Sequence, residues 1–391
     1  MHTSIPPNYA DTVAPMRATQ EDILAALARH GIAYDAYPAE LPPGRPRGAA
    51  AAQSFPMQGV LKYHGMSDWD WRIAYLPSIS VSNDAGYTLT YVEFDPDLPE
   101  DTAEIGGKPA YGRDLERVQQ SLDVIRRLAG VDSRARMVSR NVVRASKLGK
   151  GLGSSASASA ALAAAAIAAL WGPELVENRR FLSCMARLLA GSGCRSATGG
   201  LSLWLSYPGI APEDSFAVRL DTADQLKDMR LITVPIDSRV GLKTESAHRD
   251  APDSSLFKSW MHSRRDEILA CIEAIQAGDW RTLGQWAELD SIRLHGVTMS
   301  GSMENKIFGW EPENIALFRM CNDLRAAGVP VYASTDTGPT VVFLLHKDHE
   351  QTVADAITDL GMGFEVIRGN IAGPTRLIEL DAARSELGIE A

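Results

Sequence analysis

A run of glycine and serine residues near the middle of the chain has the composition of a phosphate-binding loop. Residues 149–157 read GKGLGSSAS and lie between a predicted strand and a predicted helix. Small residues let the backbone approach a phosphate chain closely, and the first turn of a helix offers unpaired N–H groups and the positive end of a dipole. The serine hydroxyls can donate to phosphate or bind Mg²⁺. The spacing fits neither a Walker loop nor a dinucleotide-binding GxGxxG motif, and the same residue types are equally typical of tight helix–sheet packing.

Residues 151–158, GLGSSASA, resemble the ATP-binding motif of the GHMP kinases, a superfamily that includes galactokinase and mevalonate kinase. The family motif often begins with proline, and Lys147 stands in that place here. The resemblance implies ATP as the phosphate donor, Mg²⁺ carried on the nucleotide, and Ser155 as the protein ligand of that metal. The residues that it implies for phosphate binding are Lys150, Gly151, Gly153, Ser154, Ser155 and Ser157.

Three further segments resemble the diphosphomevalonate decarboxylases of the same superfamily. Residues 60–66 (VLKYHGM) are similar to the family's KYWGK segment, residues 191–200 (GSGCRSATGG) to its SGSACRSxxGG segment, and residues 332–340 (YASTDTGPT) to its FDAGPN segment. They occur in the family's order around the loop, so the combination is far more specific than any one short motif. The catalytic residues that it implies are Lys62, Arg195 and Asp336.

These three residue types suit the decarboxylation of a 3-hydroxy acid, which needs a good leaving group that ATP supplies by phosphorylating the hydroxyl. Asp336 can orient that hydroxyl and accept its proton. Arg195 can hold the substrate carboxylate through two parallel hydrogen bonds. Lys62 beside Asp336 would keep it ionised and screen the transferring phosphate. Taken singly, such residues are typical of turns and surfaces, so these roles depend on the matching segments. Asp336 also distinguishes the chain from mevalonate 3-kinases, which resemble the decarboxylases but lack that aspartate.

Other polar residues of these segments are expected to contact the substrate. Residues 290–295, DSIRLH, resemble the family's DSNxxH helix, whose serine and histidine face the substrate cleft. His295 at that helical spacing is equally consistent with a packed core histidine. The predicted substrate-binding residues are Tyr63, His64, Ser192, Arg195, Ser196 and Ser291.

The chain departs from the family where the family binds the outer phosphate of a diphosphate. Met66 stands in place of the second lysine of KYWGK, and Thr102 is a loose match to an arginine that also contacts the diphosphate. A diphosphate without cationic partners binds weakly, so a substrate with one phosphate is expected. The sequence therefore predicts ATP-dependent decarboxylation of mevalonate 5-phosphate to isopentenyl phosphate, an isoprenoid precursor, by transient 3-phosphorylation. Candidates to bind the single phosphate are Arg72, Lys147 and Lys150.

Three alternative functions stay open. The first is a diphosphomevalonate decarboxylase that makes isopentenyl diphosphate with relocated cations. The second is a mevalonate 3,5-bisphosphate decarboxylase that needs no ATP, against which the intact glycine-serine loop argues. The third is a metabolite-sensing regulator with the GHMP fold. A sensor would be free to lose Asp336, so its retention with Lys62 and Arg195 favours an enzyme.

The order of predicted elements favours an α+β fold, because helices and strands are mixed rather than strictly alternating. The resemblance implies the two-lobed GHMP kinase fold with the active site between the lobes. We expect an N-terminal extension over 1–55, an ATP-binding lobe with a βαβ-type sheet over 56–225, and a ferredoxin-like lobe over 226–391. An alanine-rich helix is predicted over 156–170. The pattern also predicts helices over 115–128, 256–277, 281–295 and 313–327, and strands over 136–143, 329–334 and 340–345.

Composition and charge exclude several classes of protein. The formal net charge of the 391 residues is −10, and no basic run interleaved with aromatic residues marks a nucleic-acid surface. The longest apolar segment, 156–170, is shorter than the ~18–20 residues of a membrane helix, and no signal peptide is expected. The cysteines form no CxxC pair, which favours a reducing cytoplasm, and Cys194 is interpreted as a packed thiol. A phosphorylated mevalonate is the expected partner, and a homodimer is implied by resemblance alone.

Overall fold

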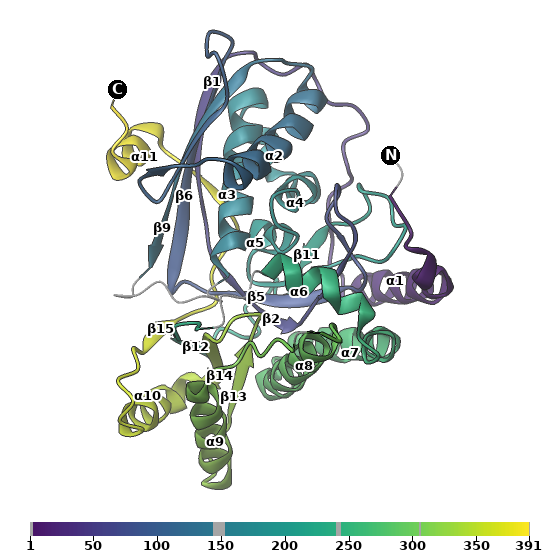
Figure 1. Ribbon diagram of the computed structural model, residues 1–391, viewed down its shortest axis with the longest axis vertical. Helices are drawn as coiled ribbons and strands as arrows, with labels where there is room; N and C mark the ends of the chain where they lie inside the picture. Colours follow the sequence, from purple (N-terminus) through teal and green to yellow (C-terminus); the bar gives the residue numbers. More distant parts are fainter. Residues whose placement is uncertain (1–2, 144–152, 240–243, 305, 391) are drawn as a thin grey trace.

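Two lobes make up the structure, with the amino-terminal lobe drawn above the carboxy-terminal lobe in Figure 1. The computed structural model describes residues 3–143, 153–239, 244–304 and 306–390. The α-helices are α1 (Val13–Arg29), α2 (Arg113–Ala129), α3 (Ser154–Trp171), α4 (Arg179–Ala186), α5 (Gly193–Thr198), α6 (Thr244–Asp250), α7 (Phe257–Ala277), α8 (Trp280–Ser300), α9 (Pro312–Ala326), α10 (Glu350–Asp359) and α11 (Leu380–Leu387). Short 3₁₀ turns are η1 (Pro7–Thr12), η2 (Pro173–Glu177), η3 (Ala251–Asp253) and η4 (Lys347–His349).

A six-stranded sheet forms the frame of the upper lobe, in the order β16-β1-β6-β9-β7-β8. Its strands are β1 (Gly48–Ser54), β6 (Gly86–Asp95), β7 (Thr102–Ile105), β8 (Lys108–Pro109), β9 (Arg134–Val143) and β16 (Arg376–Ile378). Neighbours are antiparallel except β7 and β9. Because successive side chains alternate between faces, Val92 and Phe94 pack with the main core while Tyr91 packs against α11 on the other face. Figure 1 shows α3 and α11 on opposite sides of this sheet.

The alanine-rich helix α3 packs against β1 and β6 and also against α4 and α5. Small side chains let neighbouring backbones come close: a Cβ on Gly48 would lie 2.2 Å from the carbonyl oxygen of Ala169, so only glycine fits there. By length and composition α3 could cross a membrane, but 72% of its window is buried inside the protein. The predicted helix over 156–170 is therefore confirmed as a core helix, and its amino end carries the described part of the predicted phosphate loop.

A second sheet of the upper lobe runs in the order β11-β10-β5-β2 and supplies the strand that leads to Lys62. Its strands are β2 (Met57–Leu61), β5 (Ser78–Ser82), β10 (Leu201–Trp204) and β11 (Ala217–Arg219). The pairing of β2 with β5 shifts between Gly59 and Leu61, which is a bulge just before Lys62. A separate two-stranded hairpin, β3 (Met66–Asp68) and β4 (Ile73–Ala74), follows it in the chain.

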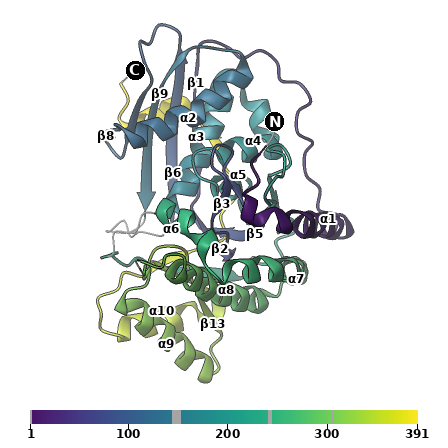
Figure 2. The ribbon, with the colours of Figure 1, turned by 45° about the vertical axis from the view of Figure 1, so that its right-hand side comes forward.

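The lower lobe holds the antiparallel sheet β13-β14-β12-β15. Its strands are β12 (Met229–Val234), β13 (Val331–Thr335), β14 (Val341–His346) and β15 (Ile367–Gly369). Helices α9 and α10 pack on this sheet, and the antiparallel pair α7 and α8 lies at the junction of the lobes. Helix α8 contacts both β2 and β13, so it joins the strands that carry Lys62 and Asp336. Figure 2 shows α1 lying along α7 at this junction.

Three elements fall on the other side of the predicted domain boundaries. Strand β1, at the end of the predicted 1–55 extension, is a full member of the six-stranded sheet. Strand β16 and helix α11, at the end of the predicted 226–391 lobe, return to the upper lobe and pair with or cover that sheet. The proline-rich strap over 41–48 crosses the ends of α2 and α3 through Gly44 N–H to Ala129 and Arg45 N–H to Leu170.

Candidate active site

Lys62 and Asp336 form an ion pair where the two lobes meet, in which the lysine is buried and the aspartate is partly exposed. Lys62 follows β2, and its Nζ lies 2.9 Å from Asp336 Oδ1 at the end of β13. The same Nζ donates to the Gly59 carbonyl oxygen at 2.6 Å and to Ser334 Oγ at 2.7 Å, so all three ammonium donors have partners. Burial lowers the pKa of Lys62, and the carboxylate of Asp336 opposes that shift. Gln58 Nε2 also reaches Asp336 Oδ1 at 3.3 Å. As far as the described residues show, Oδ2 is the oxygen left for a substrate hydroxyl.

Gly59 makes room for this ion pair. A Cβ at Gly59 would lie 2.7 Å from Lys62 Cδ and 3.0 Å from Asp336 Oδ1. Real Cβ atoms do not approach other heavy atoms so closely, so any side chain there must move the lysine or the carboxylate.

Gly59→Ala is expected to lower kcat at least tenfold and the free energy of unfolding by about 1–3 kcal/mol, as overpacking does. Steady-state kinetics and urea denaturation measure the two effects. Gly373→Ala is the matched control, because a Cβ there meets nothing within 4 Å. Normal kinetics for Gly59→Ala would show that the ion pair tolerates displacement.

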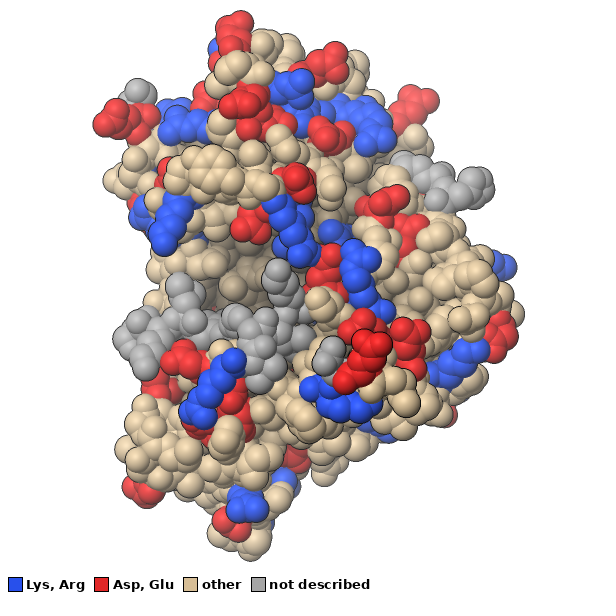
Figure 3. All heavy atoms as spheres, viewed as in Figure 1, with Lys and Arg blue, Asp and Glu red and all other residues tan. Residues whose placement is uncertain are grey.

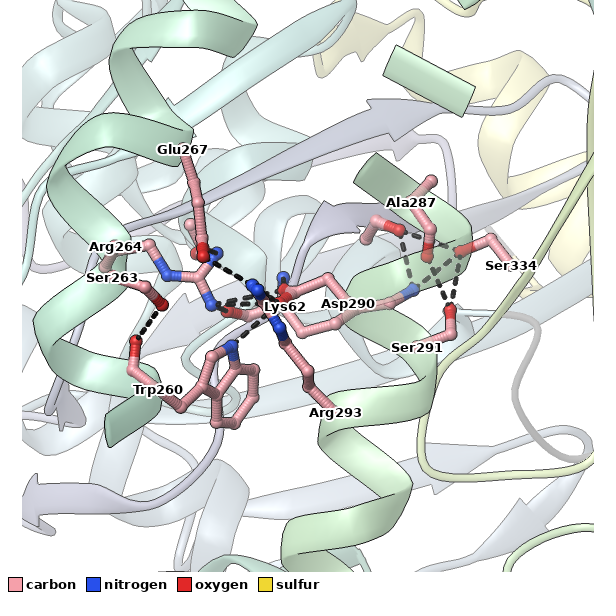
Figure 4. A network of polar contacts seen from close by, with 12 residues as sticks. Lys62, Trp260, Ser263, Arg264, Glu267, Ala287, Asp290, Ser291, Arg293 and Ser334 are labelled. Atoms are coloured by element: carbon pink, nitrogen blue, oxygen red, sulfur yellow. Dashed lines mark hydrogen bonds and ion pairs between the residues drawn. The ribbon is translucent and has the colours of Figure 1, made fainter. Parts of the chain in front are cut away.

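The main chain of Lys62 is held by a buried charge network from α7 and α8, shown in Figure 4. Asp290 Oδ2 accepts the Lys62 backbone N–H at 2.5 Å, and Arg264 Nη2 donates to the Lys62 carbonyl oxygen at 3.0 Å. Arg264 and Asp290 pair with each other at 3.1 Å with side chains 0% exposed, and Trp260 Nε1 donates to Asp290 Oδ1. These two hydrogen bonds fix the N–H and the carbonyl group of Lys62, and so they fix the point from which its side chain extends to Asp336. Breaking such a buried pair typically costs about 3–5 kcal/mol.

Arg195 is a buried guanidinium on the short helix α5. Its Nη1 donates to Ser78 Oγ at 2.9 Å, and its Cζ lies 5.1 Å from the ring centre of Tyr63. Its Nε is buried without a hydrogen-bond partner, and none of the described acidic residues forms an ion pair with it. A buried charge without a protein counter-ion is costly, so the site is suited to an anion brought by the substrate.

Tyr63 connects this centre to an open cleft of about 510 Å³. The cleft also includes Gly191 from the loop before α5 and Ser155 from the first turn of α3. Arginines from α2 and from the β3–β4 hairpin lie on its other walls. On the face of the molecule drawn in Figure 3, a hollow lies between the lobes and basic side chains stand beside it. Tyr63 therefore contacts Arg195 and also lines the cleft that holds these arginines.

The amino end of α3 has the features of a phosphate site. Gly153 is its N-cap at φ 73°, and a Cβ there would lie 2.2 Å from the Met57 carbonyl oxygen, so the turn needs glycine. No side chain caps the helix, which leaves first-turn N–H groups for an anion. Ser155 faces the cleft, but Ser157 is bonded to Thr88 Oγ1 and to the Ser154 carbonyl oxygen. The predicted contacts of Lys147, Lys150 and Gly151 lie outside the described residues.

The chain offers no ready-made metal centre in its described part. No group of three or more His, Cys, Asp or Glu side chains is placed to hold a metal ion there. The residues near α3 fit a metal carried on nucleotide phosphates, with Ser155 as the predicted protein ligand, rather than a metal held by the protein alone.

Several residues predicted to contact the substrate have buried side chains. Ser291 Oγ accepts the Thr335 N–H at 3.0 Å, and His295 Nε2 donates to the Asp336 carbonyl oxygen at 2.9 Å, so both support the β13 turn. His64 is 0% exposed and lies against Thr298 of α8 and His248. Ser192 is the N-cap of α5, and Ser196 is buried with its hydroxyl unpaired among the described residues. The side chains of His64, Ser196 and Ser291 are buried and are not among those that line the cleft, so their contact with substrate stays a prediction.

The buried histidines make stability depend on pH. Burial lowers the pKa of His295 and of His248 to about 4, and it lowers the pKa of His64 well below its usual range. The unfolded chain binds these protons near pH 6.5, so stability is complete above that pH and is lost as the pH falls towards 4. Urea denaturation is expected to show a loss of a few kcal/mol between pH 7 and pH 4.5. His295→Gln should reduce this pH dependence, whereas the exposed His262→Gln should not; identical curves for both variants would contradict the burial argument.

Residue types missed by the sequence interpretation complete the site. Gln58, Gly59 and Ser334 contact the ion pair, and Asp290 and Arg264 hold the Lys62 backbone. The DSIRLH segment contained a signal for Asp290, which is its first residue. Cys194 is fully buried with Sγ 3.0 Å from the Gly191 carbonyl oxygen, and burial raises its pKa to about 12, so its interpretation as a packed thiol is confirmed.

The fold and site define a GHMP-fold enzyme, and comparisons with known proteins specify the family. Residues 54–217 match the family of diphosphomevalonate decarboxylase-like N-terminal domains. A phosphomevalonate decarboxylase from Haloferax volcanii is 36% identical over 331 residues, which cover 84% of this chain and 98% of the relative. Mevalonate diphosphate decarboxylase from Staphylococcus aureus superposes with a TM-score of 0.77 at 29% identity, covering 85% and 98% of the two chains.

A third related structure is MDDEF in complex with MVAPP, AMPPCP and magnesium. It has a TM-score of 0.76 and 26% identity, and the match covers 85% of this chain and 99% of that one. The chain belongs to the diphosphomevalonate decarboxylase family. The two-lobed GHMP kinase fold and the α+β class predicted from the sequence are confirmed, and so is a decarboxylase of the mevalonate pathway.

Proposed function

We propose that this protein converts mevalonate 5-phosphate and ATP into isopentenyl phosphate, CO₂, ADP and phosphate. The observation that carries the choice of substrate is Met66. It stands where the family has a lysine for the diphosphate, and it lines the cleft with its Cε against Gly191. An apolar methyl there favours one phosphate over two. The similarity to a relative named phosphomevalonate decarboxylase supports the same choice.

We assign a task to each residue of the centre on the basis of its chemistry and position. Arg195 binds the substrate carboxylate, and Asp336 Oδ2 orients the 3-hydroxyl and accepts its proton as the phosphoryl group arrives. Lys62 keeps Asp336 ionised and balances charge on the transferring phosphate. The bond between the carboxyl carbon and C2 then breaks, its electron pair forms the C2–C3 double bond, and phosphate leaves C3 with the electron pair of the C–O bond.

ATP would be held by the amino end of α3. Gly153 permits close approach, first-turn N–H groups face the phosphates, and Ser154 and Ser155 add hydroxyls. ATP supplies the phosphoryl group that turns the hydroxyl into a leaving group, and Mg²⁺ is expected on its phosphates with Ser155 nearby. The intact turn argues against a bisphosphate decarboxylase that needs no ATP.

The experiment follows CO₂ and ADP release from four substrates with ATP and Mg²⁺: mevalonate, its 5-phosphate, its 5-diphosphate and its 3,5-bisphosphate. CO₂ and ADP in equal amounts from the 5-phosphate support the proposal. Release from the 5-diphosphate alone would show that the cations have moved, and CO₂ from the bisphosphate without ATP would assign a different reaction. Binding without CO₂ or ADP would favour a sensor.

A homodimer and a cytoplasmic location belong to the same proposal. The first rests on the family resemblance and the second on four buried free cysteines. Light scattering on the purified protein tests the dimer.

A further inference from the structure

Two arginines in the cleft carry charge that the protein does not neutralise. Arg72, Arg113 and Arg117 line it together with Asp114 and Glu245. Glu245 pairs with Arg113 and also with Arg249 of α6. No described acidic residue forms an ion pair with Arg72 or Arg117, and Arg117 Nε is buried without a described hydrogen-bond partner. Burial and the neighbouring arginine charges lower the pKa of both guanidinium groups. An anion in the cleft would relieve this repulsion.

The backbone of Arg72 is held in a conformation that a side chain disfavours. Its φ is 52°, in the left-handed region that glycine adopts freely. Only one other non-glycine residue of the described chain, Asp224, shares this feature. A residue keeps a strained backbone conformation only where the surrounding contacts hold it there, and such residues are common at ligand sites. Arginine at this position indicates that its side chain is needed in the cleft.

The amino-terminal segment and one buried arginine fix the turn that carries Arg72. Ser4 donates its N–H and its hydroxyl to Asp68 Oδ2 at 2.8 and 3.0 Å. The other oxygen of Asp68 accepts the Trp71 N–H at 2.8 Å, and Arg187 Nε donates to the Trp71 carbonyl oxygen at 2.7 Å. The residue before Arg72 is therefore held at both of its backbone polar groups. Removing Ser4 removes one support of this turn.

Trp69 separates the cleft from a neighbouring cavity. Arg72 lies over its ring at 5.4 Å and Arg249 at 4.5 Å, measured from each Cζ to the ring centre. Arg72 lines the cleft that contains Ser155, whereas Arg249 lines the adjacent cavity beside the amino-terminal segment. The two arginines are thus close in space and equal in charge, but only one lines the cleft.

We propose that Arg72 and Arg117 bind the single phosphate at the far end of the substrate, and that residues 3–6 act as a positioning segment for Arg72. The assignment rests on the proposed function, since it names the site that reads the 5-phosphate. It replaces the cations that the family places at the positions of Met66 and Thr102 with Arg72, from the turn of the β3–β4 hairpin, and Arg117, from α2. Arg113 is already paired with Glu245, so it contributes to the positive electrostatic potential of the cleft and does not bind the phosphate directly.

Calorimetric titration of the complete protein with mevalonate 5-phosphate and with mevalonate tests the subsite. Arg72→Gln and Arg117→Gln are each expected to raise Kd for the 5-phosphate at least tenfold and to change Kd for mevalonate less than twofold. Arg249→Gln is the matched control and should stay within twofold for both ligands. Arg72→Gly should bind the 5-phosphate as weakly as Arg72→Gln while its Tm stays equal or rises, because the backbone strain is relieved.

Equal weakening towards both ligands, or unchanged binding of the 5-phosphate by Arg72→Gln and Arg117→Gln in an active enzyme, would overturn the subsite. A wild-type protein that binds neither ligand and releases no CO₂ would instead overturn the proposed function.

For the positioning segment, deletion of residues 1–6 should raise KM for the 5-phosphate at least threefold with kcat retained, and should have no further effect in Arg72→Gln. Ser4→Ala replaces the deletion if that variant does not fold. An equal rise in KM in both backgrounds would show that the segment does not act through Arg72.

Discussion

Asp336→Asn is expected to lower CO₂ release from mevalonate 5-phosphate about 10³-fold, within the range that a positioned general base contributes. Asparagine has the same shape and keeps an oxygen that can accept from Lys62 and Gln58. It cannot accept the proton of the tertiary hydroxyl. It also removes the carboxylate that opposes the lowering of the Lys62 pKa by burial, so the ammonium is less available to balance the phosphate.

The fold should survive this substitution. The Asp336 side chain is 21% exposed, so the loss of its ion pair costs less than for a fully buried pair, and we expect the free energy of unfolding to fall by no more than about 2 kcal/mol. Asp359→Asn, at the exposed end of α10, is the control for removing one carboxylate from the lower lobe. ADP and CO₂ release are measured together, and both should fall in parallel. Rapid ADP release without CO₂ would mean that Asp336 acts after phosphoryl transfer and is not the proton acceptor.

The sequence predicted the residues that share a motif with the family, and the structure brings these together. Lys62 and Asp336 are 274 positions apart, yet the motifs around them were sufficient to pair them. Most long helices were also placed within a few residues: the pattern over 313–327 became α9, and that over 115–128 became α2. Periodicity of apolar residues is local information, so it does not require knowledge of the fold.

Residues that act through a three-dimensional arrangement were not predictable in the same way. Ser291 and His295 lie four residues apart on α8, so they share a helix face, but the sequence does not say whether that face meets the substrate or β13. It meets β13. The partnership of Arg264 with the Lys62 backbone joins segments 202 positions apart. Arg117 was not singled out, because its role depends on a hairpin from another part of the chain.

The amino-terminal and carboxy-terminal segments show the same limit. Strand β16 has three residues, and it pairs with β1 across more than 300 positions (Ala51 with Ile378), so no local pattern distinguishes it from a loop. Ser4 contacts Asp68 across 64 positions. The beginning of the predicted 1–55 extension therefore contacts the β3–β4 hairpin, which also carries Arg72.

Arg195→Gln is expected to lower kcat/KM for mevalonate 5-phosphate by about 10²–10³-fold, because a buried charge-assisted pair with the substrate carboxylate is lost. Glutamine keeps one donor for Ser78 but has no charge and no fork of parallel N–H groups. Arg195→Lys restores the charge without the second parallel bond and should recover no more than about tenfold. Ser78→Ala removes the hydrogen bond to Nη1 and should have a smaller effect of the same kind.

A substrate that lacks the carboxylate separates this role from a structural one. 3-Hydroxy-3-methylbutyl phosphate keeps the tertiary hydroxyl and the phosphate, so ADP release from it reports phosphoryl transfer alone. If Arg195 acts on the carboxylate, its loss and the loss of the carboxylate remove the same interaction, and the two effects are not additive. The wild-type preference for mevalonate 5-phosphate over the analogue should therefore collapse in Arg195→Gln, while turnover of the analogue changes less than threefold. If turnover of both compounds fell equally, Arg195 would support the structure of the site rather than bind the substrate carboxylate. The partner of its buried Nε would then be another anion.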